Sequence, residues 1–348
     1  MRARFKAAAA SALAATAVAA AWAPTAQATP TFSLRVEVPG ATLVPGTYYA
    51  VPRTTLARRG TLSNNSSGVC VPSTGRHELD GQTALGLVAT AAQANRTLEP
   101  LLVAEDSFGR RLCRVAEVIE RDLPSFSGWL YRYNHVAPPL SGELVSLARD
   151  SEVLWVFADF GNGANTGDEL LLTAPVRTQP GLVQVGVQTI TFEGVSGPAP
   201  DGTVVTGGSA PAATVGGVAT VALGEGETEL RAVGAGASAG NIPSAPQSVC
   251  VAANLEDCPP ERGRRVIGTN GNDGLAGTPG PDRIRARGGK DKVRVRGGDA
   301  DVVNCGKGKD VVIADEDDKL KRCERVRGPA GKGDKDGKGR KRGGGGGK

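Results

Sequence analysis

The sequence predicts a multidomain, mainly β protein: an α+β N-terminal domain, a small β-sandwich, a short parallel β-roll and a disordered basic tail. Three observations lead to this prediction. The 348 residues include 49 glycines and 22 prolines, which argues against a mostly helical chain. Nearly all aromatic residues lie between Phe32 and Phe160, so only that part has the side chains for a large core. A nine-residue repeat begins at Gly268.

The first 28 residues have the pattern of a secretory signal peptide. A positively charged start is followed by the apolar residues 7–21 and by Ala-Gln-Ala at 26–28, a small-residue cleavage site. After residue 22 no apolar run is long enough to span a membrane, so we expect no transmembrane anchor. The expected location is secreted or extracellular, including association with the cell surface.

Six cysteines in an exported chain predict disulfides. Among the fifteen possible pairings, the sequential one is the simplest, because each pair then lies within one compositional block or at its edge. None of the cysteines stands in a CxxC or Cys/His pattern, so we expect no zinc site. The predicted disulfides are Cys70–Cys113, Cys250–Cys258 and Cys305–Cys323.

Residues 29–174 predict an α+β domain. Leu34, Val36 and Val38 alternate with polar residues, as in a half-buried strand. Asp80 is placed to cap a helix whose apolar residues recur at helical spacing. The strands expected after this helix cover residues 115–119, 128–133 and 153–157.

The order of three motifs in this domain resembles a known family. They are Thr-Ala-Leu at 83–85, Ser-Gly-Trp-Leu-Tyr-Arg-Tyr-Asn at 127–134 and Val-Leu-Trp-Val-Phe at 153–157. This order resembles bacterial domains of unknown function related to the C-terminal domain of transcobalamin and intrinsic factor. In the vitamin-binding relatives this domain closes over cobalamin held by a helical barrel. The present chain has no such barrel, so the resemblance does not extend to cobalamin.

The aromatic residues of these motifs allow two interpretations. In the first they line a site for an unidentified small molecule. In the second they form the core and pack a hairpin. The residues concerned are Trp129, Tyr131, Tyr133 and Trp155.

Residues 175–253 predict a small β-sandwich. Val183, Val185 and Val187 alternate with polar residues, and short apolar runs at 218–223 and 228–233 lie between glycine-rich turns. The segment resembles the immunoglobulin-like spacer modules of bacterial surface proteins. Residues 254–265 are polar and contain proline, so we expect a linker.

Residues 266–327 contain the repeat, written as five rows of nine with one inserted residue and followed by a sixth, imperfect row around Asp318 and Leu320. The sixth place of each row is an aspartate, and an aliphatic residue follows two positions later. The rows resemble the calcium-binding repeats of RTX hemolysins. That resemblance implies a parallel β-roll in which Asp273 faces Asp291, Asp282 faces Asp301, and Asp291 faces Asp310, with calcium held by these carboxylates and by turn carbonyls.

The charge of the repeat argues in the opposite direction. Residues 29–260 carry 14 basic and 22 acidic side chains, whereas residues 261–327 carry 17 basic and 12 acidic ones. A cation site surrounded by cations is weakened. The alternative is therefore a degenerate roll that no longer binds calcium. The basic residues nearest the expected ligands are Arg283, Arg285, Lys290, Lys292 and Arg294.

The tail, residues 328–348, has seven basic and two acidic residues and almost no apolar side chains, so we expect disorder. Its charge suits an anionic cell-wall polymer. Nucleic acid is not an expected partner.

We expect no enzyme. The only histidines are His77, expected in an exposed loop, and His135, expected in a hairpin turn, and no hydrolase or nucleotide-binding motif occurs. The function predicted from the sequence is a secreted, non-enzymatic envelope protein with calcium-binding repeats and an N-terminal binding or adhesive module. The alternative is a small-molecule-binding protein with a degenerate roll.

Overall fold

The computed structural model describes residues 29–62, 70–107, 109–120 and 127–328. These residues form a mainly β protein with several sheets and one α-helix. The predicted signal peptide and basic tail lie outside the described residues. Among the helices of the described part, none is long and apolar enough to cross a membrane.

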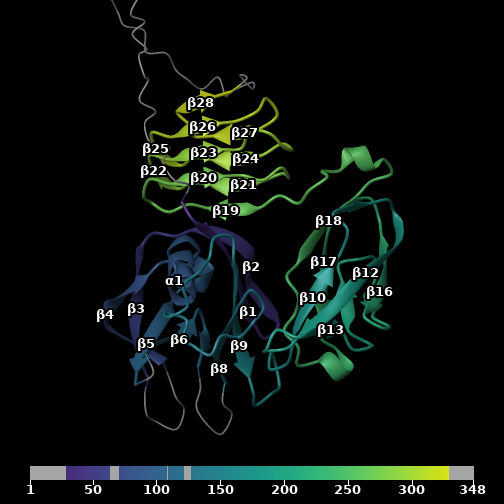
Figure 1. The fold of residues 1–348 in the computed structure, drawn as a ribbon, viewed down its shortest axis with the longest axis horizontal. Helices are drawn as coiled ribbons and strands as arrows, with labels where there is room; N and C mark the ends of the chain where they lie inside the picture. The colour runs from purple at the N-terminus through teal and green to yellow at the C-terminus, as the bar shows by residue number, and fades with distance from the viewer. Residues whose placement is uncertain (1–28, 63–69, 108, 121–126, 329–348) are drawn as a thin grey trace, which may run out of the picture.

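The first unit, residues 29–168, has two sheets with helix α1 (Ala84–Ala94) packed against them (Figure 1). One sheet has the order β2-β1-β9-β8 and the other the order β4-β3-β5-β6-β7. The strands of the first sheet are β1 (Thr31–Val38), β2 (Ala41–Ala50), β8 (Ser127–Tyr133) and β9 (Glu152–Asp159). Those of the second are β3 (Thr54–Leu62), β4 (Cys70–Asp80), β5 (Leu101–Asp106), β6 (Gly109–Val115) and β7 (Val118–Ile119).

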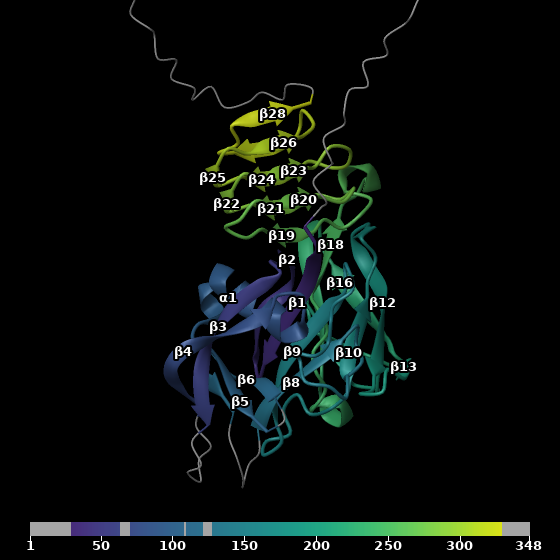
Figure 2. The ribbon, with the colours of Figure 1, turned by 60° about the vertical axis from the view of Figure 1, so that its left-hand side comes forward.

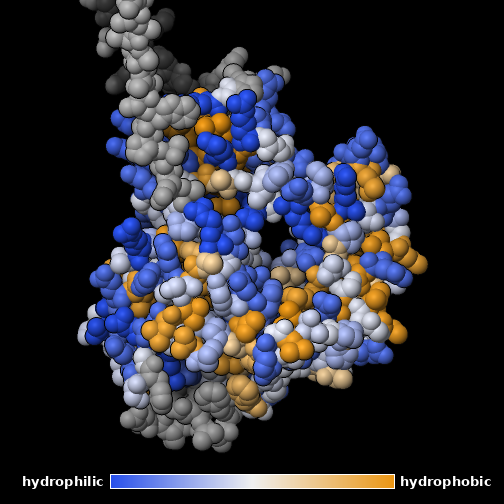
Figure 3. All heavy atoms as spheres, in the orientation of Figure 1, coloured by the Kyte–Doolittle hydropathy of each residue, from blue (hydrophilic) through white to orange (hydrophobic). Residues whose placement is uncertain are grey.

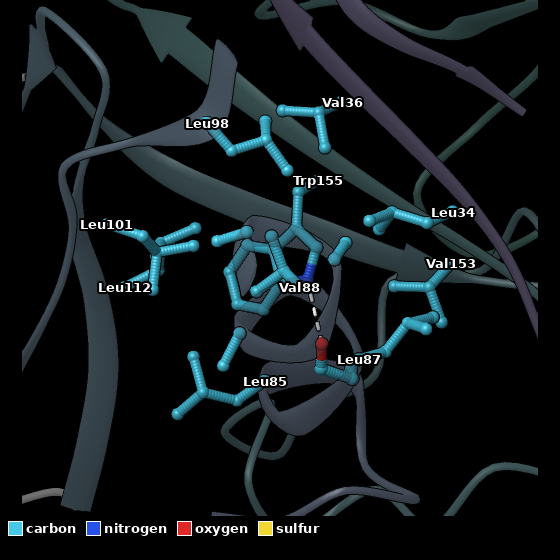
Figure 4. Close-up of a cluster of buried hydrophobic side chains, with 14 of the residues drawn as sticks. Leu34, Val36, Leu85, Leu87, Val88, Leu98, Leu101, Leu112, Val153 and Trp155 are labelled. Atoms are coloured by element: carbon cyan, nitrogen blue, oxygen red, sulfur yellow. Dashed lines mark hydrogen bonds between the residues drawn. The ribbon is translucent and has the colours of Figure 1, made fainter. Parts of the chain in front are cut away.

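The helix begins later than its sequence suggests. Thr83 is the N-cap, and its hydroxyl accepts a hydrogen bond from the Gly86 amide at 3.1 Å. The expected cap, Asp80, is wrong, because its carboxylate accepts from the Gln82 amide in the preceding turn. The buried face of α1 packs around Trp155, whose indole N–H donates to the Ala84 carbonyl at 3.0 Å (Figure 4).

The strands expected at 128–133 and 153–157 are present as β8 and β9. The strand expected at 115–119 is wrong. The chain turns at Ala116, which has a φ of 51°, so β6 and β7 pair as a tight hairpin instead of continuing as one strand.

The sandwich, residues 169–258, buries an apolar core between two layers, which are antiparallel except for β11, which pairs in parallel with β18. Its first strand, β10, lies before the predicted boundary at 174 but pairs with β12, so residues 169–173 belong to the sandwich. One layer contains β10 (Glu169–Thr173), β12 (Gly181–Ile190), β13 (Ser196–Pro198) and β16 (Val218–Leu223). The other contains β11 (Arg177–Thr178), β14 (Val204–Thr206), β15 (Ala212–Ala213), β17 (Gly226–Val233) and β18 (Gln247–Val251).

The roll, residues 265–328, is a stack of three-residue parallel strands that alternate between two facing sheets. One sheet contains β19 (Arg265–Ile267), β21 (Arg283–Arg285), β24 (Val302–Asn304) and β27 (Lys319–Lys321). The other contains β20 (Gly274–Ala276), β23 (Lys292–Arg294), β26 (Val311–Ile313) and β28 (Arg325–Arg327). The aliphatic residue of every predicted row is buried between the sheets: Leu275, Ile284, Val293, Val303 and Val312.

Glycines allow the rungs of the roll to stack closely at one corner. Short strands β22 (Gly288–Gly289) and β25 (Lys307–Gly308) pair there in parallel. Gly289 has a φ of +126°, and a Cβ on it would lie 2.2 Å from the Gly271 carbonyl oxygen. A side chain at this position would therefore separate the stacked turns.

The roll is built directly on the first unit. Strand β19 pairs in parallel with β2, placing Val266 beside Tyr48 and Ile267 beside Tyr49. This pairing makes one eight-stranded sheet with the order β27-β24-β21-β19-β2-β1-β9-β8. Figures 1 and 2 show the roll stacked on β2, with the sandwich beside the first unit. The chain therefore leaves the first unit, forms the sandwich and returns to extend the original sheet.

All three predicted disulfides are present: Cys70–Cys113, Cys250–Cys258 and Cys305–Cys323. The described residues include no free cysteine. Three disulfides suit an oxidising, extracytoplasmic environment.

The Cys305–Cys323 disulfide should contribute substantially to the stability of the roll. It closes an 18-residue loop, for which chain entropy predicts a contribution of roughly 3 kcal/mol. We expect the double variant Cys305→Ser/Cys323→Ser to lose hydrogen-exchange protection in the peptides covering residues 265–328. The matched variant Cys250→Ser/Cys258→Ser should leave those peptides protected. Equal protection of the roll in both variants would contradict this role.

Candidate functional site

The five aspartates of the repeat make up most of the buried carboxylate residues in the described part of the chain. Each precedes a rung of the roll, and each is at most 5% exposed. The three residues of a rung alternate outward, inward and outward, so the carboxylate lies at the corner where a turn enters the sheet. The five aspartates are Asp273, Asp282, Asp291, Asp301 and Asp310.

In one sheet the carboxylates form a ladder with the backbone. The amide of Asp273 donates to the Asp291 carboxylate at 2.9 Å, and the amide of Asp291 donates to the Asp310 carboxylate at 2.9 Å. The amide of Asp310 donates in turn to Glu324 at 2.9 Å. Each carboxylate therefore ties its own rung to the rung before it.

The other sheet has the same arrangement. The amide of Arg264 donates to Asp282 at 2.5 Å, that of Asp282 to Asp301 at 2.7 Å, and that of Asp301 to Asp318 at 2.9 Å. The structure thus brings together the three aspartate pairs that the repeat pattern placed face to face.

The two ladders extend beyond the residues that the repeat pattern identifies, to Glu324 in one sheet and to Arg264 in the other. Glu324 stands before the rung Arg-Val-Arg at the spacing that the aspartates have in other rungs. Its side chain was not recognised because glutamate replaces aspartate there. Arg264 occupies the equivalent place before β19, in the segment predicted to be a linker.

The second carboxylate oxygens divide the aspartates into two groups. In Asp273 and Asp282 both oxygens accept hydrogen bonds, with Thr269 and Thr278 as local donors. In Asp291, Asp301 and Asp310 the Oδ2 atom is buried and has no hydrogen-bond partner within the described part of the chain. Buried carboxylate oxygens without a donor are costly, so each of these three oxygens favours a bound cation, a proton or a water molecule beside it.

The electrostatics of the ladders point to the same positions. Burial, together with repulsion from Asp273 and Asp310, raises the pKa of Asp291 to about 7. Burial and repulsion from Asp282, Asp318 and Asp317 raise the pKa of Asp301 to about 7. Burial is the larger cause of both shifts, and the repulsion adds to it because carboxylates of consecutive rungs in one sheet are neighbours.

The basic residues that flank the ladders do not neutralise them. Arg283, Arg285, Lys292 and Arg294 are the outward residues of their rungs and are exposed. The ladder carboxylates accept bonds from backbone amides and threonines instead. The oxygen-only donor set of the ladders is the kind that calcium and magnesium prefer.

The four aromatic residues considered for a small-molecule site lie in the core or pack against it. Trp129 and Trp155 are buried, and Tyr131 stacks on Trp155 with ring centroids 5.0 Å apart. The hydroxyl of Tyr131 donates to the Leu140 carbonyl at 2.6 Å, and that of Tyr133 accepts from the Ala148 amide at 3.1 Å. A groove of about 500 Å³ lies on the sandwich instead, beside Leu182 and Val215, and none of the four lines it.

The expectation of an exposed His77 is wrong. Its side chain is 3% exposed, because β4 continues through this residue. Burial and the neighbouring Arg59 and Arg110 hold the pKa of His77 below its ordinary value.

A second polar cluster joins the first unit to the sandwich. His135 lies in the expected turn, with a φ of 71°, and its Nδ1 is 3.2 Å from the Glu169 carboxylate. Ligand atoms of His135, Glu152 and Glu169 lie within 4.8 Å of one another, a spacing compatible with a metal. However, the fully buried guanidinium of Arg35 pairs directly with the same Glu169 oxygen. A cation is therefore already present, and the cluster is an ion-pair network.

The hydrogen bond with Glu169 raises the pKa of His135 despite burial. Burial opposes ionisation of Glu169, but His135, Arg35 and Arg132 together hold its pKa below the ordinary value. The sequence pattern missed this network because Arg35 alternates with apolar residues and was expected on an exposed face.

No family model matches the chain, and neither a curated protein nor a solved structure is significantly similar to it.

The pairing of Arg35 with Glu169 should be essential for docking of the sandwich. We expect Arg35→Met to destabilise the protein by about 3–5 kcal/mol, because it leaves the Glu169 carboxylate buried without its principal cation. Denaturant unfolding measures the loss. The exposed Arg58→Met is the matched control and should change stability little; an equally small effect at Arg35 would show that the pair is dispensable.

The ladders should make the stability of the roll depend on pH when divalent cations are removed. The pKa of Asp301 is about 7 in the folded state and 3.8 ordinarily, so its contribution is present below pH 4 and lost as the pH rises through 7. In chelator we expect stability to fall by an amount on the order of 2 kcal/mol between pH 5 and 8. Thermal melting of Asp301→Asn should lack this part of the decrease, whereas the exposed Glu316→Gln should retain it. A pH dependence unchanged in Asp301→Asn would refute the assignment.

Proposed function

We propose that the protein is an extracytoplasmic binding protein whose roll holds divalent cations with the ligand preference of calcium. The observation that supports the proposal is the set of three buried, partnerless Oδ2 atoms on Asp291, Asp301 and Asp310. Asp291 and Asp310 lie on successive rungs of one ladder and Asp301 lies in the other, so both ladders contain a buried carboxylate oxygen that a cation would satisfy.

A cation satisfies this requirement better than a proton near neutral pH. With a pKa of about 7, Asp291 and Asp301 are each about half ionised at pH 7, and mild alkalinity adds buried negative charge to both ladders. Calcium takes six to eight oxygen ligands and tolerates irregular geometry. Asp291 with Asp310 in one sheet, and Asp301 with Asp318 in the other, would supply carboxylates, and the turns would supply carbonyls.

The excess of basic side chains in the repeat is compatible with a cation bound between its sheets. The basic residues face outward and are exposed, so solvent and salt screen their repulsion of an interior cation. Their net effect is to weaken the site. We therefore propose a dissociation constant on the order of 10⁻⁴ to 10⁻³ M, which is the range of extracellular calcium modules.

In this proposal the first unit and the sandwich have supporting roles. The first unit provides the strand edge on which the roll is built, and the sandwich covers the outer face of its first sheet. The roll resembles RTX repeats, and the first unit resembles the transcobalamin C-terminal domain, in their sequence motifs. The small-molecule alternative has no supporting observation, since its four aromatic residues make packing and backbone contacts.

Calcium should stabilise the roll, and the effect should depend on the partnerless carboxylates. At millimolar calcium we expect stabilisation of about 1 kcal/mol by mass action. The variant Asp291→Asn/Asp310→Asn keeps an acceptor for each backbone amide but loses the anionic ligands of one ladder. The rise of its melting temperature in calcium should therefore be clearly smaller than that of the wild-type protein, with the remainder supplied by Asp301 and Asp318. Calorimetric titration and thermal melting of the full chain measure both effects.

The matched control is Glu225→Gln/Glu227→Gln, which removes two exposed carboxylates from the sandwich. This control should retain the calcium response. If the wild-type protein melts identically in calcium and in chelator, the proposal is wrong and the ladders act only as proton-dependent backbone caps.

A further inference from the structure

Four rungs of the roll carry a basic residue at both outward positions. These rungs are β21, β23, β27 and β28, two in each sheet of the roll. All eight side chains are exposed, and none forms an ion pair within the described part of the chain. We call them the outer basic residues: Arg283, Arg285, Lys292, Arg294, Lys319, Lys321, Arg325 and Arg327.

In-register pairing arranges these residues as a grid. Lys292 and Arg325 are both in register with Val311, which lies between them in the sheet. Neighbouring strands are about 4.8 Å apart, and alternate residues along a strand about 7 Å, so each sheet presents four cations on a grid of roughly 7 by 10 Å. The second sheet repeats the arrangement, with Arg283 and Lys319 on either side of Val302.

Acidic residues are excluded from both grids. Those of the roll either belong to the ladders or lie at the corner that contains Asp299, Asp315, Glu316 and Asp317. The opposite corner contains Arg287, Lys290, Lys307 and Lys309, which join the two grids into one basic band. Figure 3 shows hydrophilic side chains surrounding a smaller hydrophobic patch on the visible part of the roll.

We propose that this basic band binds a linear polyol-phosphate polymer outside the cell. A repeated, rigid cation grid suits a chain that carries a negative charge on every unit. Five of the eight outer basic residues are arginines, whose planar guanidinium groups bind phosphate oxygens in pairs. This inference does not depend on cation binding by the ladders.

Two observations favour this partner over the obvious alternatives. Residues 254–328 contain no aromatic side chain, so the roll has no platform on which the bases of a single-stranded nucleic acid could stack. The last rungs, β27 and β28, carry lysine or arginine at both outward positions, so a second copy stacked on this end would meet like charges. The basic band would therefore recognise its partner through the anionic groups that the partner carries.

The test uses full-length protein in chelator with fluorescently labelled poly(glycerol phosphate) of defined length. Binding measured by fluorescence anisotropy should weaken at least tenfold between about 50 and 200 mM salt. The variant Lys292→Gln/Arg294→Gln/Arg325→Gln/Arg327→Gln removes one grid. We expect it to lose about tenfold in affinity and to show a shallower salt dependence, by roughly 0.7 per lost contact.

The matched control removes the same charge from exposed arginines of the first unit: Arg53→Gln/Arg58→Gln/Arg76→Gln/Arg96→Gln. It should retain affinity within about twofold, because non-contacting charges act only through the screened net charge. A second variant, Arg283→Gln/Arg285→Gln/Lys319→Gln/Lys321→Gln, tests the other grid, and thermal melting verifies that each variant is folded.

Three outcomes would overturn the proposal. The first is that the wild-type protein does not bind the polymer. The second is an equal loss in the grid and control variants, which would assign binding to net charge or to other parts of the chain. The third is tighter binding of oligo(dT) or polyglutamate than of poly(glycerol phosphate), which would assign the band to a different class of partner.

Discussion

The parallel pairing of β19 with β2 is the contact on which the rest of the architecture depends. A roll of three-residue rungs has one aliphatic side chain per rung in its core and cannot bury much surface by itself. Pairing Val266 and Ile267 with Tyr48 and Tyr49 gives the first rung a preformed edge, so each later rung adds to an existing sheet. The stacking of Arg264 on the Tyr48 ring, at 4.5 Å, strengthens the same junction. The roll is thus an extension of the first unit and not a separate domain on a linker.

The short rungs also separate the charges of the roll. With only three residues per rung, the central aliphatic residue points inward, the two neighbours point outward, and the preceding acidic residue is held at the corner. A segment with excess positive charge can therefore keep carboxylates inside and cations outside. The two proposed activities, cation binding in the interior and polyanion binding on the surface, follow from this one geometric rule and use different residues.

Docking of the sandwich uses buried charges in addition to a small apolar cluster in which Ile242 packs with Leu154 and Val156. Arg35 pairs with Glu169, and Glu37 pairs with Arg231 at 2.7 Å, so both charged residues of β1 point toward the sandwich. Arg132 adds bonds to the carbonyls of Ile190 and Thr191. Such a junction depends on complete pairing, because a buried charge without its partner is strongly destabilising.

The sequence by itself determined the local features: strands β8 and β9, the sequential disulfides, the aliphatic core of the roll and the face-to-face aspartates. Each follows from periodicity or spacing, which act over a few residues or over one repeat. Only the tertiary structure decided which surfaces meet. The alternation of Leu34, Val36 and Val38 indicated a strand with one wet face, but the sandwich buries Arg35 and Glu37 on that face. Likewise β19 was expected in or beside a linker, because its pairing partner lies more than 200 residues earlier in the chain. Pairing between distant strands produces no periodic pattern in the sequence. The edge of β2 could pair with many different strands, because the backbone hydrogen bonds are the same whichever side chains the strands carry.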